Sequence, residues 1–166
     1  GAPVNASTVV ISLVGESDVG RDISIGDTVK ILYSFHPHPG ELRTLVGGTP
    51  RIVRNGRNLT GDQENAEGTA IDFSSKRHPR TGVGFSQDST VVYFITVDGR
   101  QQSSVGMTLP EFADLMISLG VSDGLNLDGG GSTTMMVEGA VVNSPSDAAG
   151  ERPVGNCLLL VEHKTP

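Results

Sequence analysis

The sequence is poor in the residues on which several common kinds of site depend. Its 166 residues include one cysteine and no tryptophan, and only 4% of them are aromatic. A single cysteine cannot form an internal disulfide, a cysteine-based zinc site or an iron–sulfur cluster. No apolar run approaches the roughly 18 residues of a transmembrane helix. Cys157 itself lies in an apolar run, so we expect it to be a small buried core residue.

Positive charge is also scarce. Twelve Lys and Arg stand against 19 Asp and Glu, which gives a formal net charge of -7. A chain of this charge has no long-range attraction for nucleic acid or anionic lipid, so neither is expected as a partner. Nine of the twelve basic residues are arginines, however. Arginine binds phosphate with a planar pair of donors, so local anion sites remain compatible with the acidic total.

Glycine, by contrast, is abundant: 22 residues, nearly twice the average share of about 7%. This excess indicates many turns between short strands, or a site built from backbone. Runs rich in β-branched or aromatic residues predict strands, whereas residues 55–68 and 143–153 read as loops. The predicted strands are 8–14, 28–35, 51–54, 69–73, 90–97, 134–137 and 156–161, with a short one at 124–127.

One helix is predicted over 108–119. Thr108 and Glu111 have the spacing of a capping box, Pro110 falls in the first turn, and Gly120 offers a left-handed stop. Apolar residues between them recur on one helical face, as in a core-packed helix. Many short strands with one strong helix favour an α+β fold, a strand-rich mixed sheet with the helix packed on it.

The run from Asp128 to Thr134 is the sharpest local feature. Three consecutive glycines can expose successive N–H groups as an anion-binding nest, and Ser132 and Thr133 add hydroxyl groups. No Gly-Lys-Ser/Thr follows, so the run is not a P-loop. A Gly-rich hairpin turn remains the alternative interpretation.

Two further segments carry candidate side chains. Asp98-Gly99-Arg100 is typical of a hairpin turn, or it places Asp98 and Arg100 in one cleft with Asp128. Residues 77–82 form a cationic connection between strand-like runs and contain His78 and Arg80.

Five blocks, in this order along the chain, resemble the phosphodiester glycosidase family. They are 78–84, 97–100, 106–111, 125–135 and 151–156, and segment 45–56 resembles an earlier part of the family. The resemblance covers roughly residues 43–163. It implies that 43–166 form the core, as the C-terminal part of a longer domain, preceded by a β-rich section at 1–42. It also implies an exported protein that hydrolyses an N-acetylglucosamine α-1-phosphodiester at the sugar side and leaves a phosphomonoester.

The chemistry of that bond suggests a role for each candidate. Phosphate leaves well, so Arg and backbone N–H groups can replace much of the work of a general acid. Asp128 is the expected nucleophile or base, Asp98 a second carboxylate or orienter, and His78 a donor of a hydrogen bond or a proton. The expected phosphate and substrate contacts are Arg80, Thr81, Arg100, Gly129, Gly130, Gly131, Ser132, Thr133, Asn143, Arg152 and Asn156.

Two alternatives to an enzyme stay open. One is a non-catalytic carbohydrate- or phosphoglycan-binding module, and the other is a structural β-rich domain whose glycines only form turns. No cofactor is required for the expected reaction. A divalent cation held by Asp98, Asp128 and Asp147 is a further alternative, which the spacing does not predict.

Overall fold

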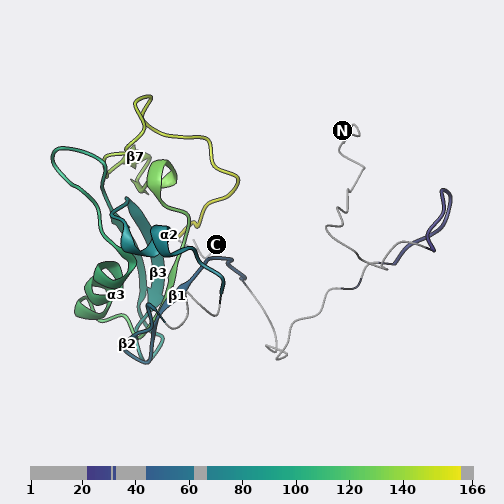
Figure 1. Ribbon diagram of the computed structural model, residues 1–166, viewed down its shortest axis with the longest axis horizontal. Coiled ribbons are helices and arrows are strands. Elements are labelled where there is room, and N and C mark those ends of the chain that lie inside the picture. The colour runs from purple at the N-terminus through teal and green to yellow at the C-terminus, as the bar shows by residue number, and fades with distance from the viewer. Residues whose placement is uncertain (1–21, 31, 33–43, 62–66, 162–166) are drawn as a thin grey trace, which may run out of the picture. The chain divides into compact units, whose positions relative to one another are not determined.

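The computed structural model describes residues 22–30, 32, 44–61 and 67–161 (Figure 1). The chain divides into two compact units, Gly1–Thr44 and Leu45–Pro166. In the first unit, the described residues form a turn in which Asp27 N–H donates to the Ser24 carbonyl over 3.1 Å. The predicted strand at 8–14 lies outside the described residues, and the described part of 28–35 contains no strand.

The second unit is built on a five-stranded antiparallel sheet with the order β2-β1-β5-β3-β4. A separate pair, β6 and β7, forms a small second sheet. The strands are β1 (Arg51–Arg54), β2 (Arg57–Asn58), β3 (Arg80–Phe85), β4 (Val92–Val97), β5 (Asp123–Asn126), β6 (Met136–Val137) and β7 (Ala140–Val141). The helices are α2 (Ile71–Ser75) and α3 (Leu109–Ser118), with a 3₁₀ turn η1 at Gly130–Ser132. The α+β expectation is confirmed.

Helix α3 begins and ends as its sequence predicts. Thr108 Oγ1 accepts from Glu111 N over 3.3 Å, and Glu111 Oε2 accepts from Thr108 N over 3.0 Å, which completes the capping box. Gly120 follows with φ of 101°, a value that favours glycine. The helix lies on one face of the sheet (Figure 1), where its buried side chains form the core with residues of the strands. The buried core residues are Ile52, Val53, Ile95, Leu109, Phe112, Ala113, Met116 and Val121.

Strand β3, between β5 and β4, was not predicted, because its two glycines weaken the pattern of a strand. The structure shows why glycines stand there. A Cβ on Gly82 would lie 2.9 Å from the Phe112 ring, and one on Gly84 would lie 2.9 Å from the Asp123 carbonyl. Both positions therefore lack a side chain because neighbouring elements pack directly on the strand.

Four other expectations differ from the structure. The run 69–73 is wrong as a strand: it leads into helix α2, and a short apolar run cannot distinguish the two by its pattern. The run 156–161 forms no strand, and Cys157 within it is exposed instead of buried in the core. The loop predicted at 55–68 contains β2. The strands predicted at 51–54, 90–97 and 124–127 are confirmed as β1, β4 and β5 within a residue or two at each end, and that at 134–137 is confirmed only in part, as β6.

We expect the substitution Phe112→Ala to lower the free energy of unfolding by about 3–5 kcal/mol, because the ring is fully buried against Gly82. Chemical denaturation would measure the loss. Phe85→Ala is the matched control, since Phe85 lies on β3, the strand that carries Gly82, but is 44% exposed. A loss for Phe112→Ala no larger than that of the control would contradict this account of the core.

Candidate active site

Six of the predicted site residues, His78, Arg80, Arg100, Asp128, Gly129 and Gly130, converge at one edge of the sheet. Strand β3 pairs antiparallel with β4 and β5, so its first residue, Arg80, lies beside Val97, the last residue of β4, and Gly82 lies beside Asn126, the last residue of β5. The segment before β3 and the segments after β4 and β5 therefore meet. They enclose a pocket of about 240 Å³. It is lined by Phe73, His78, Pro79, Arg80, Arg100, Asp128, Gly129 and Gly130.

His78 and Arg100 contact each other in this pocket, with 3.0 Å between His78 Nδ1 and Arg100 Nη2. A guanidinium only donates hydrogen bonds, so Nδ1 accepts, and the ring proton of a neutral imidazole lies on Nε2. Partial burial, followed by the charges of Arg80, Arg100 and Lys76, lowers the pKa of His78 from its ordinary 6.5. His78 is therefore a neutral donor of a hydrogen bond through Nε2.

Arg100 is not part of a hairpin turn, because β4 is followed by an irregular segment up to Met107. Its φ of 58° lies in the left-handed region, which costs a non-glycine residue about 1 kcal/mol and is often found at functional sites. A Cβ on Gly130 would lie 3.2 Å from both Nη atoms of Arg100. The guanidinium thus lies directly against the Gly-rich turn.

That turn is tightly bonded. Gly130 N–H donates to the Pro79 carbonyl over 2.9 Å, and the N–H groups of Ser132 and Thr133 donate to Gly129 and Gly130 carbonyls. These three donors are used within the protein, so the expected nest is a closed 3₁₀ turn at these positions. Asp128, just before it, is exposed and lines the pocket. Two residues before Asp128, Asn126 is 1% exposed and donates through Nδ2 to the carbonyls of Thr49 and Leu127.

Arg80 has a buried guanidinium and is 1% exposed in total. Its Nε donates to the Met107 carbonyl over 2.9 Å, and its Nη2 donates to the carbonyls of Phe73 and Lys76 over 2.8 and 3.0 Å. The guanidinium also lies 5.0 Å from the centre of the Phe73 ring. Arg80 therefore joins α2, β3 and the segment before α3 at the wall of the pocket.

Asp98 is not among the residues that line the pocket; it joins two other segments. Its carboxylate accepts from Asn143 Nδ2 over 3.0 Å and from Ser144 N over 3.0 and 3.1 Å. Asn143 Nδ2 also donates to the Thr133 carbonyl, and Thr133 Oγ1 accepts from Thr81 Oγ1 over 3.2 Å. These contacts tie the start of the Arg100 segment to the residues after the Gly-rich turn.

Arg152 is paired with Asp147, with Nε and Nη2 donating to Oδ2 over 2.8 and 2.7 Å. Gly131 has no room for a Cβ because both side chains of this pair lie against it. Ser132 is half-buried in the same turn, while Asn156 is exposed and is not among the residues lining the pocket. Arg100 and Arg152 thus contact neighbouring glycines of one turn, and Arg152 carries its counter-ion with it.

Phe73 and Pro79 line the pocket and were not predicted. Pro79 stands inside a motif that was singled out, between His78 and Arg80. No sequence motif points to Phe73, because its position in the pocket depends on helix α2 and on its contact with the Arg80 guanidinium.

The described ranges hold no cluster of three or more His, Cys, Asp or Glu side chains arranged to bind a metal ion. None of their helices has the length and apolarity that crossing a membrane needs.

The family model for phosphodiester glycosidases matches residues 5–161. The chain belongs to the phosphodiester glycosidase family. The match starts well before residue 43, where the resemblance read from the sequence blocks begins. It includes every residue of the pocket.

Relatives of known name agree with this membership. The chain is 31% identical over 110 residues to N-acetylglucosamine-1-phosphodiester alpha-N-acetylglucosaminidase of Bos taurus, covering 62% of the chain and 20% of that protein. It is 42% identical over 84 residues to the SPbeta prophage-derived uncharacterized protein YomE of Bacillus subtilis (strain 168), covering 51% of the chain and 13% of that protein. The chain therefore spans about a fifth or less of each of these relatives.

Among solved structures, the zebrafish N-acetylglucosamine-1-phosphodiester alpha-N-acetylglucosaminidase catalytic domain, auto-inhibited by its pro-peptide, is similar with a TM-score of 0.55. The sequences are 28% identical, and the match covers 66% of this chain and 37% of that one. The fold of the described core is thus shared with a catalytic domain of the family.

We expect His78 to titrate below 6.5, because burial and neighbouring cations oppose its protonation. As the pH falls from 6.5, the unfolded chain takes up this proton first, so folding stability is lost until the pH reaches the folded-state pKa. NMR titration of the imidazole would measure that pKa. In Arg100→Met it should rise part of the way towards 6.5, and a wild-type value at or above 6.5 would contradict the geometry.

Proposed function

We propose that this chain hydrolyses a sugar 1-phosphodiester at the glycosidic bond and releases the sugar and a phosphomonoester. The substrate class that we propose is N-acetylglucosamine-α-1-phospho-R. The observation that carries the proposal is the joint presence of Asp128, Arg100 and a neutral His78 around one pocket. Membership of the phosphodiester glycosidase family supports the same reaction.

In this proposal, Arg100 and His78 bind the phosphate. Arg100 offers the planar donors that suit phosphate oxygens, and the Nε2–H of His78 adds a hydrogen bond without a further charge. Because the phosphomonoester that departs is a good leaving group, stabilising its developing charge replaces the proton that an alkoxide would need. The backbone of Gly129 and Gly130 forms the adjacent wall.

Asp128 acts at the sugar side. It is the one carboxylate among the residues that line this pocket, and it is exposed to an incoming substrate. A carboxylate beside the anomeric carbon either attacks it directly or activates a water molecule, and it stabilises the positive charge that develops there. We propose Asp128 for this role.

In the proposal, the other predicted residues support the site without acting on the substrate directly. Arg80 supplies positive charge at the wall of the pocket. The segments that carry Arg100 and the Gly-rich turn are oriented by the hydrogen bonds among Asp98, Asn143, Thr81 and Thr133. Arg152, paired with Asp147, supports the turn at Gly131, beside Ser132. The family also supports an exported protein, which activity in the culture medium or periplasm would test.

A second candidate function is a phosphoglycan-binding module without turnover. The observation in its favour is that Asp128 is the one carboxylate among the residues lining the pocket, whereas most glycosidases use a pair of carboxyl groups. Such a module would use the same Arg100 and His78 contacts. Binding of a sugar 1-phosphodiester without hydrolysis would support it over the enzyme.

We expect Asp128→Asn to lower kcat by about 10³-fold or more, as loss of a catalytic carboxylate does in other hydrolases. The assay incubates the protein with an N-acetylglucosamine 1-phosphodiester and uses a phosphatase to report the exposed monoester. Asp88→Asn is the matched control, because Asp88 is an exposed carboxylate at the turn between β3 and β4, at the other end of these strands. Wild-type turnover in Asp128→Asn would overturn the assignment.

We expect Arg100→Lys to raise KM about tenfold or more, because an ammonium group cannot reproduce the planar pair of donors. The same assay over a range of substrate concentrations measures it. Arg57→Lys, on the exposed strand β2, is the control and should leave KM unchanged. Equal kinetics for Arg100→Lys and the wild type would remove Arg100 from the phosphate site.

A further inference from the structure

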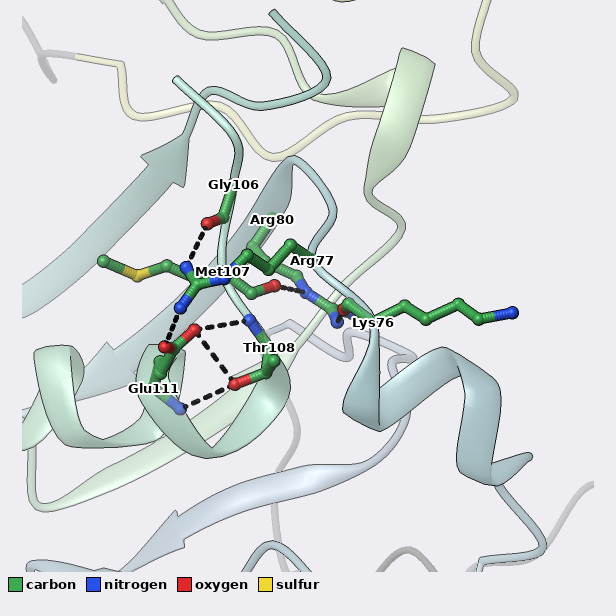
Figure 2. A network of polar contacts seen from close by, with 7 residues as sticks. All are labelled: Lys76, Arg77, Arg80, Gly106, Met107, Thr108 and Glu111. Atoms are coloured by element: carbon green, nitrogen blue, oxygen red, sulfur yellow. Dashed lines mark hydrogen bonds and ion pairs between the residues drawn. The ribbon is translucent and has the colours of Figure 1, made fainter.

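A network of charged and polar side chains joins the start of α3 to Arg77, the residue before His78 (Figure 2). We propose that the ion pair of Arg77 and Glu111 in this network is a positioning device that fixes His78 against Arg100. The inference rests on the proposed function for its effect on catalysis. Its effect on His78 is independent of any substrate.

The backbone of His78 is set by the segment before α3. His78 N–H donates to the Met107 carbonyl, and Met107 N–H donates to the His78 carbonyl, both over 3.1 Å. Gly106 has φ of 86°, and a Cβ there would overlap the His78 carbonyl. A shift of Gly106 or Met107 therefore moves His78 with it.

Arg77 holds this segment from one side. Its Nη1 donates to the Gly106 carbonyl over 2.9 Å, and its Nη2 is paired with Glu111 Oε1. Successive side chains of an extended segment point to opposite sides. Arg77 thus reaches α3 while the next residue, His78, lines the pocket.

Glu111 connects Arg77 to the start of the helix. Its Oε2 accepts from Thr108 N over 3.0 Å and from Thr108 Oγ1 over 3.1 Å, while Oε1 is left for Arg77 (Figure 2). The Thr108 N–H, then the Thr108 hydroxyl and the Arg77 charge, hold the pKa of Glu111 below its ordinary value. Glu111 is therefore a carboxylate at neutral pH, and each of its oxygens fixes a different element.

The Arg77–Glu111 pair contributes more to the position of His78 than to the stability of the fold. The side chains of Arg77 and Glu111 are 48% and 41% exposed, and ion pairs of that exposure contribute little to stability. A contact such as the 3.0 Å between His78 Nδ1 and Arg100 Nη2 depends steeply on distance and angle, however. Small displacements of a group that binds the reacting part of a substrate lower turnover strongly.

The test is Glu111→Gln. Glutamine also completes a capping box, so the helix start is kept while the charge on Arg77 loses its counter-ion. We expect kcat to fall about tenfold with KM changed less, and the nitrogen-15 resonances and the pKa of the His78 imidazole to move as its contact with Arg100 loosens. Asp114→Asn is the matched control, because it removes an exposed carboxylate of the same helix that accepts from Asn58 Nδ2 instead of contacting the His78 segment, and it should change neither kcat nor the His78 signals.

The outcomes separate this inference from the proposed function. His78 resonances unchanged in Glu111→Gln, or changed equally in Asp114→Asn, would overturn the positioning role. Shifted His78 resonances in a protein that does not hydrolyse the sugar phosphodiester would support the positioning role and would overturn the proposed enzymatic function. Arg77→Met combined with Glu111→Gln should shift His78 no more than Arg77→Met alone, since that change already removes the partner of Glu111 together with the bond to Gly106. Additive shifts would show that the two residues do not act as a pair.

Discussion

The walls of the pocket depend on one buried cation. Taking a guanidinium out of water costs several kcal/mol unless its donors find partners. Arg80 finds them in the carbonyls of Met107, Phe73 and Lys76, which come from two separate segments of the chain. Each carbonyl must stay where it is for the charge to remain satisfied. The cost of burying Arg80 is thus what holds α2 and the segment before α3 in a fixed relation to β3.

This arrangement also explains why a small sheet can carry a site. In an antiparallel sheet, the start of one strand lies beside the ends of its neighbours. Here that rule brings His78, Arg100 and Asp128 to the same edge from three distant parts of the chain. The glycines of β3 let Phe112 and Val121 pack directly against the strand, so the sheet edge rests on a close-packed core.

The sequence predicts this structure where its signals are local. The capping box of Thr108 and Glu111 and the strand at 51–54 depend on neighbours in sequence, and both are found as predicted. Strand β3 cannot be predicted from local signals. Glycine weakens a strand, and the reason for Gly82 is its contact with the Phe112 ring, which is distant in sequence. The grouping of His78, Arg100 and Asp128 followed from the order of motifs, whereas Phe73 entered the pocket through long-range contacts to Arg80 that no local pattern encodes.

The neutral state of His78 matters for the proposed reaction because of charge balance. A phosphodiester carries one negative charge, whereas the phosphomonoester product carries about 1.5 to 2 at pH 7. Every added positive charge in the pocket would therefore stabilise the product more than the substrate, and product would leave slowly. A neutral imidazole gives the phosphate a hydrogen bond without that penalty, and the Asp128 carboxylate opposes the extra charge of the product. In the proposed reaction, partial burial and the charges of Arg80 and Arg100, which lower the pKa of His78, would thus keep the site selective for the less charged ligand.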